Sequence, residues 1–146
     1  MDIFISVITN KYIYIPFCLW FAIQTFKVIW DLIKDKRFNF KRVLGAGGMP
    51  SSHSAIVCSL AAMIGKSEGF GSPVFGLAVI VALVVMYDAA GVRRAAGKQA
   101  KLLNKIVETP GLGIGQVQEK LVEVLGHSPI EVFVGAVLGI IVGSIF

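Results

Sequence analysis

The sequence predicts an all-α protein, a compact multi-pass transmembrane helical bundle in which some membrane helices are short or partial. The chain is one domain of 146 residues, of which 55% are hydrophobic and only 16% charged, well away from soluble averages. Eleven of its 14 basic residues fall in two segments, 34–42 and 93–127, that flank apolar runs. Such clustering is typical of membrane topology, so the net charge of +5 does not indicate a nucleic-acid partner.

A first membrane-spanning helix is expected over residues 12–33, after a short apolar start. Gln24, Lys27 and Asp31 follow one another at helical spacing and form a single polar stripe. A polar stripe in a membrane helix usually faces protein or a wet cavity, which makes Lys27 a candidate site residue. The alternative is a simple Lys27–Asp31 pair near the edge of the membrane.

The next feature is the string Gly-Gly-Met-Pro-Ser-Ser-His-Ser at residues 47–54. Paired glycines and a proline suit a tight turn whose N–H groups point inward, and serines open a helix whose N-terminus favours anions. Gly48, Ser51 and Ser52 are therefore candidates for phosphate binding, and His53 for proton transfer near pH 7. The alternative is a plain Gly-Pro turn with a serine N-cap and a surface histidine.

The apolar run after this motif has only 12 residues, Ser54 to Gly65, or about 18 Å of helix. It is too short to cross about 30 Å of hydrocarbon. Either the helix begins within the motif, which gives an element over 52–65, or it is a partial or tilted element. The next span is expected over 73–88, with Asp88 at its end.

Small residues and two adjacent arginines, Arg93 and Arg94, follow Asp88. They are either a solvated charged face or part of a site, and the proximity of Asp88 favours a site. Segment 93–127 is expected to be helical and cytoplasmic, with helices over 95–107 and 114–125.

The last span is expected over 130–146. Ser128-x-x-Glu131 with Pro129 between them predicts a capping box, which gives Glu131 a structural role as one alternative. Glycines recur every four residues at 135, 139 and 143 and predict a close-packing face.

Short basic loops stay in the cytoplasm, so both basic segments belong on that side of the cell membrane. The scattered polar residues then converge on the cytoplasmic face and offer cations, hydroxyls, two histidines and two carboxylates. Phosphoryl transfer needs positive charge around the phosphate oxygens and an acid for the leaving oxygen. One histidine can attack phosphorus while the other protonates the leaving group, and a carboxylate can fix the tautomer of the attacking imidazole.

These residues resemble the motifs of the type 2 phosphatidic acid phosphatase superfamily, which includes lipid phosphatases and vanadium haloperoxidases. Lys27 is similar to its helix lysine, Pro50-Ser51-Ser52-His53 to its second motif, and Arg93 or Arg94 with His127 and Glu131 to its third. The strings Gly-Gly-Met-Pro-Ser-Ser-His-Ser-Ala, Asp-x-x-Gly-Val-Arg-Arg and Leu-Gly-His-x-Pro-x-Glu-Val resemble a divergent branch of that superfamily over about residues 20–140.

The resemblance implies that His127 is the nucleophile, oriented by Glu131, and that His53 is the acid. It also implies that Lys27, Ser52 and an arginine hold phosphate. The departures are Ser52 in place of the middle glycine, Glu131 in place of an aspartate, and a gap of about 33 residues between arginine and histidine. Asp88 has no counterpart. The chain is short for the six-helix core of the family, so a homodimer is a way to complete the bundle.

The expected function is therefore a membrane phosphatase acting on a lipid phosphate monoester or diphosphate, without metal or other cofactor. Phosphatidylglycerophosphate, phosphatidate and prenyl diphosphates are candidate substrates. One alternative is a metal-assisted phospho-alcohol transferase, although two carboxylates are few for a magnesium site. The other alternative is a non-catalytic membrane protein that binds phosphorylated lipid head groups.

Overall fold

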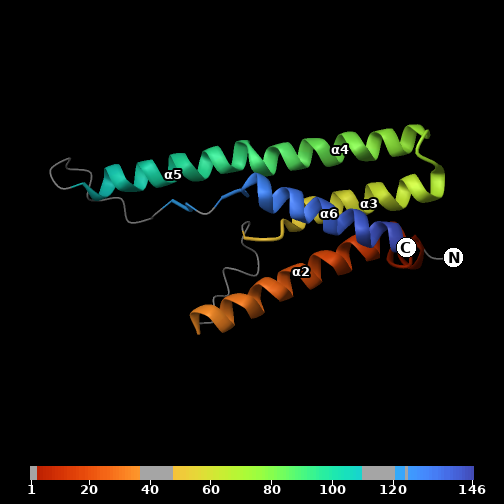
Figure 1. Ribbon diagram of the computed structural model, residues 1–146, viewed down its shortest axis with the longest axis horizontal. Helices are drawn as coiled ribbons and strands as arrows, with labels where there is room; N and C mark the ends of the chain where they lie inside the picture. The colour runs from red at the N-terminus through yellow and green to blue at the C-terminus, as the bar shows by residue number, and fades with distance from the viewer. Residues whose placement is uncertain (1–2, 37–47, 110–120, 124) are drawn as a thin grey trace.

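The computed structural model describes residues 3–36, 48–109, 121–123 and 125–146, and these residues form helices and no strand (Figure 1). The helices are α1 (Ile3–Ile8), α2 (Lys11–Asp35), α3 (Ser52–Glu68), α4 (Pro73–Ala90), α5 (Val92–Glu108) and α6 (Pro129–Ile145). The stretches Lys11–Lys34 and Pro73–Glu108 are long and apolar enough to cross a membrane, and Pro129–Ile145 is a shorter apolar helix. The all-α class predicted from composition is confirmed.

Three of the helices have a serine at the N-cap position. Ser51, Ser72 and Ser128 are the N-caps of α3, α4 and α6, and each accepts a hydrogen bond from an amide of the first turn. The capping box predicted at Ser128 and Glu131 is confirmed in both of its halves. Helix α3 begins within the glycine–serine motif, which was one of the two options for this short run. It has 17 residues and is about 26 Å long.

Helices α3 and α6 form the tightest contact of the bundle. A Cβ added at Gly135, Gly139 or Gly143 would collide with the carbonyl oxygen of Ser51, Ala55 or Ser59, respectively. The close-packing face predicted from the glycine spacing is therefore confirmed. Because residue numbers rise together along this contact, the two helices are parallel, and both N-termini lie at the same end.

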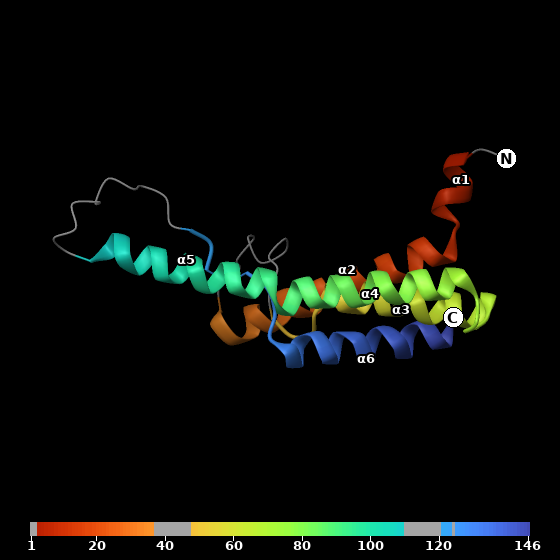
Figure 2. The same ribbon diagram turned by 90° about the horizontal axis from the view of Figure 1, so that it is seen from above.

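Helices α4 and α5 form one nearly continuous rod (Figures 1 and 2). Helix α4 ends at Ala90, two residues beyond the expected end at Asp88. The Gly91 N–H bonds the Tyr87 carbonyl at 2.8 Å and closes α4, and the Ala95 N–H bonds the Gly91 carbonyl at 2.9 Å in the first turn of α5. Only Gly91 separates the two helices. Helix α5 consequently projects beyond the other helices (Figure 2).

The helix expected over 114–125 does not form at residues 121–123 and 125, while 110–120 and 124 lie outside the described residues. Instead, this segment runs back along α5. The Asn104 side chain accepts from the Leu121 N–H at 3.0 Å and donates to the Leu121 carbonyl at 2.9 Å. Gly97 leaves room for the backbone of Glu123 and Leu125. Because α5 satisfies these backbone groups, the helical spacing of apolar residues is overridden.

Candidate functional site

The candidate site lies where the N-termini of α3 and α6 meet. The Ser51 N–H donates to the Glu131 carbonyl at 3.0 Å and ties the two helix starts together. His53 is in the first turn of α3, and His127 directly precedes the N-cap of α6. Their rings meet edge to face with centroids 5.9 Å apart. Two positive helix-dipole ends therefore point at one pair of imidazoles.

The junction of α4 and α5 positions His127. The His127 N–H donates to the Ala89 carbonyl at 2.9 Å. Gly126 has φ of 80°, and a Cβ there would collide with the backbone of Arg93 and Arg94. Only a residue without a side chain fits this close approach. About 33 residues separate the arginines from His127 in the sequence. The contacts of Gly126 and His127 with the α4–α5 junction nevertheless place them side by side.

Both imidazoles hold buried nitrogen atoms that lack a protein partner. His127 is 2% exposed, and among the described residues its Nδ1 and Nε2 atoms have no hydrogen-bond partner, nor does Nδ1 of His53. A buried polar atom without a partner costs about 1–3 kcal/mol, so most such groups in proteins are satisfied. This cluster of unsatisfied nitrogens indicates a site that receives a polar ligand.

Positive charge surrounds the pair. Lys27 of α2 is 7% exposed, so it is buried within the bundle. Burial lowers the pKa of His127 from its ordinary 6.5 to about 4. Lys27 is the next largest contributor to that lowered pKa, ahead of Arg93, whereas Glu131 opposes it. At neutral pH the His127 imidazole is therefore uncharged and keeps a lone pair available for attack on an electrophile.

Ser51 and Ser52, which begin the Ser-Ser-His part of the motif, have different surroundings. Ser51 is 0% exposed, and its Oγ accepts from the Ser54 N–H at 3.4 Å and the Ser54 hydroxyl at 3.0 Å. That side chain is committed to capping. Ser52 is buried in the first turn of α3, where its amide and that of His53 have no carbonyl within the helix. Gly48, at φ of 80°, lies in the turn before α3 with open space around it.

The carboxylates do not take the places that the resemblance implied. Glu131 Oε2 accepts from the Ser128 N–H at 2.8 Å, and no described residue hydrogen-bonds to the His127 ring, so Glu131 caps α6 and does not orient the imidazole. Asp88 Oδ2 accepts from Arg93 Nε at 2.5 Å. Arg93, fixed by this ion pair and close enough to act on His127, is the better placed of the two arginines. Both arginine side chains are exposed, so Arg93 is distinguished by its ion pair and its effect on His127 and not by burial.

Two positioning features were not predicted from the sequence, namely the Ala89 carbonyl and Gly126. A backbone acceptor leaves no signature in the sequence, whereas a glycine directly before a candidate histidine was a usable signal. Within the described part of the chain, no group of three or more His, Cys, Asp or Glu side chains is arranged to hold a metal ion.

The fold and the site define a class of protein: a helical bundle with apolar membrane-length helices that gathers two helix N-termini, two imidazoles and cationic side chains at one place. The chain belongs to the divergent PAP2 family, which matches residues 8–142. Over 129 residues it is 40% identical to the uncharacterized membrane protein YuiD of Bacillus subtilis (strain 168), covering 81% of this chain and 82% of YuiD. No solved structure matches the chain. The resemblance inferred from the motifs is confirmed, and the chain is a membrane protein.

Proposed function

We propose that this protein is a membrane phosphatase that hydrolyses a lipid phosphate monoester or diphosphate through a phosphohistidine intermediate. The observation that carries the proposal is the His53–His127 pair, with centroids 5.9 Å apart and partnerless buried nitrogens. That separation is within the reach of one phosphate group bound between the rings. The pair sits at two helix N-termini, which stabilise negative charge.

In the first step a ring nitrogen of neutral His127 attacks phosphorus, and the bond from phosphorus to the leaving oxygen breaks. His53 in its protonated form gives that oxygen a proton, so the lipid leaves as an alcohol, or as a monophosphate when the substrate is a diphosphate. His127 now carries the phosphoryl group. The low pKa of His127 favours this role, because the free imidazole is not protonated at neutral pH.

In the second step water attacks the phosphohistidine, and neutral His53 accepts a proton from that water. The bond between His127 and phosphorus breaks, inorganic phosphate leaves, and both histidines return to their starting forms. Lys27, Arg93 and the amides of Ser52 and His53 stabilise the charge on the phosphoryl oxygens throughout. Asp88 is a positioning residue that fixes the Arg93 guanidinium through their ion pair.

The cytoplasmic face is proposed from the distribution of basic residues. Segment 34–42 carries five and segment 93–127 carries six, and short segments rich in lysine and arginine stay on the cytoplasmic side. In the sequence, segment 34–42 begins at the end of the helix that carries Lys27, and segment 93–127 begins with Arg93 and ends with His127. A phosphorylated lipid in the inner leaflet carries its phosphate at the cytoplasmic face. Phosphatidylglycerophosphate, phosphatidate and prenyl diphosphates therefore remain the candidate substrates.

The experiment is phosphate release by purified protein from these three lipids, with and without chelator and orthovanadate. We expect turnover of at least one lipid, inhibition by vanadate, and no effect of chelator. His127→Ala and His53→Ala should each reduce turnover by at least about 1,000-fold, the scale at which a nucleophile or proton donor contributes. Lys98→Gln, on the exposed surface of α5, is the matched control and should retain activity. Turnover at the wild-type level in both histidine variants would refute the proposal.

A second candidate function is non-catalytic binding of phosphorylated lipid head groups. The capping role of Glu131 favours it, because no carboxylate then fixes the tautomer of His127. Saturable binding of phosphate or vanadate with no release from any of the three lipids would select this function over hydrolysis. Activity that disappears with chelator would instead select a metal-assisted transferase.

A further inference from the structure

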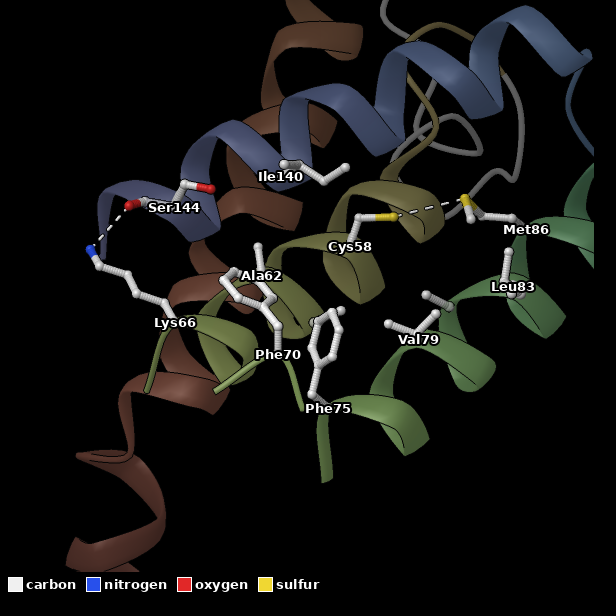
Figure 3. A pocket seen from close by; sticks show the side chains of 12 residues that line it. Cys58, Ala62, Lys66, Phe70, Phe75, Val79, Leu83, Met86, Ile140 and Ser144 are labelled. Atoms are coloured by element: carbon white, nitrogen blue, oxygen red, sulfur yellow. Dashed lines mark hydrogen bonds between the residues drawn. The ribbon is translucent and has the colours of Figure 1, made fainter. Parts of the chain in front are cut away.

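A groove of about 510 Å³ runs between α3, α4 and α6, half-open to the surroundings (Figure 3). Its lining is almost wholly apolar. The side chains that form it include Cys58, Ala62, Phe75, Val79, Leu83 and Met86. This size is typical of a site for one small-molecule ligand or one part of a lipid.

The two ends of the groove differ in their distance along α3 from the histidines. At the end far from His53, Phe70 and Phe75 meet edge to face with centroids 5.2 Å apart. There the Lys66 ammonium donates to the carbonyls of Ser144 and Ile145, at 3.0 and 3.3 Å, and ties α3 to the end of α6 (Figure 3). The other end is marked by Cys58 and Met86, whose sulfur atoms are 3.8 Å apart.

The end at Cys58 and Met86 is the nearer one to the histidine pair along α3 and α4. Residues three or four positions apart share a helix face. Five residues follow this spacing from the groove to the site: Val79, Ala82, Met86, Ala89 and Arg93. The first three line the groove, Ala89 bonds the His127 N–H through its carbonyl, and Arg93 stands beside the histidines. Groove and site are therefore successive parts of one surface.

This surface is somewhat longer than the hydrocarbon depth of one leaflet, which is about 15 Å. From His53 to Lys66 α3 advances thirteen residues, which is about 20 Å of helix. The hydrocarbon region of one leaflet is half of a core about 30 Å thick. A lipid whose phosphate lies at the histidines has its chain at the depth of the groove, where the surrounding medium is hydrocarbon and the lining is apolar.

We propose that the groove holds one hydrocarbon chain of the phosphorylated lipid whose head group lies between His53 and His127. This inference rests on the proposed function and adds to it a determinant of specificity. The Phe70–Phe75 wall ends the groove and so sets the chain length that fits. A phosphate ester without a long chain uses only the histidine end, whereas a long-chain substrate gains additional binding from the groove.

The test compares two tryptophan variants at adjacent positions of α4. Val79→Trp fills the groove, whereas Ile80→Trp places the same side chain on the exposed face of α4, outside the groove. We expect Val79→Trp to lower kcat/KM for dipalmitoyl phosphatidate at least tenfold and to change that for dihexanoyl phosphatidate less than twofold. Ile80→Trp should leave both values unchanged. Equal effects of the two variants on the long-chain substrate would overturn the inference.

A second measurement uses the wild-type protein and needs neither turnover nor a correctly folded variant. Phosphatidate with a photoactivatable diazirine at the end of its acyl chain should label peptides containing Phe70, Phe75 or Val79. Labelling spread evenly over all faces of α4 would overturn the inference. Labelling confined to the groove in a protein that releases no phosphate from any lipid would support the groove and reject the phosphatase.

Discussion

Helix α3 packs against α6 on one side and α4 on the other, and the two interfaces are built differently. Toward α6 the glycines at 135, 139 and 143 bring the backbones together, so that no side chain separates them. Toward α4 the side chains leave the groove that ends at Phe70 and Phe75. The α3–α6 interface is closely packed at all three glycines, whereas the α3–α4 interface leaves a groove.

This contrast separates two tasks. The tight interface fixes the parallel N-termini of α3 and α6, next to which His53 and His127 lie, so the geometry of the candidate site depends on close backbone contacts. The loose interface need not fix anything so closely and can admit a flexible hydrocarbon chain. We therefore expect substitutions in the tight interface to affect folding and all substrates, and those in the loose interface to affect long-chain substrates.

The largest effect is expected from Gly139→Leu, which would place a side chain against the Ala55 backbone. Overpacking typically costs about 1–3 kcal/mol, and a collision with backbone lies at or above the upper end. The matched control is Gly76→Leu in α4, where an added Cβ meets nothing within 4 Å. Thermal unfolding in detergent checks both variants. A melting temperature of Gly139→Leu equal to that of wild type would show that the close contact is dispensable.

The next effect separates the two arginines. Arg93→Gln should lower kcat/KM by about 100-fold, the loss typical of removing one group that stabilises transition-state charge. Arg94→Gln should lower it no more than about twofold, because Arg94 contacts Gly126 through its backbone, whereas the Arg93 side chain is held by Asp88. Steady-state phosphate release measures both values. A larger loss in Arg94→Gln than in Arg93→Gln would show that Arg94, and not Arg93, binds the phosphate.

The smallest effect is a dependence of stability on pH. The pKa of His127 is about 4 in the folded protein and about 6.5 once unfolded, so the unfolded chain binds more protons between these values. Stability should fall as the pH drops from about 6.5 to about 4, by at most about 3 kcal/mol. The uncharged variant His127→Asn should lack this component. Unfolding curves that shift in parallel for both proteins over this pH range would contradict the burial of a neutral imidazole.

Much of the fold was predictable because its signals are local. Membrane-length apolar runs, the Ser128–Glu131 capping box and the glycine spacing of α6 each depend on residues a few positions apart. The candidate site was predictable in part, because Lys27, His53, Arg93 and His127 each belong to a recognisable local motif.

The errors have non-local causes. The helical spacing at 121–125 was overridden by the Asn104 side chain, which lies more than fifteen residues earlier in the chain. Helix α4 extends two residues beyond Asp88, through Ala89 and Ala90, and ends where Gly91 caps it. The role of Glu131 had two compatible interpretations, and only the geometry of its carboxylate decided between them.

The central claim is that His127 forms a covalent bond to phosphorus while His53 moves protons. The most direct measurement is mass-spectrometric mapping of the His53→Ala protein quenched during reaction with a prenyl diphosphate, whose leaving group needs the least protonation. Without His53 to activate water, the intermediate should accumulate as an acid-labile phosphoryl group on His127, and it should be absent from the double variant with His127→Ala. A phosphoryl group on another residue, or phosphate release that persists in the double variant, would contradict the account.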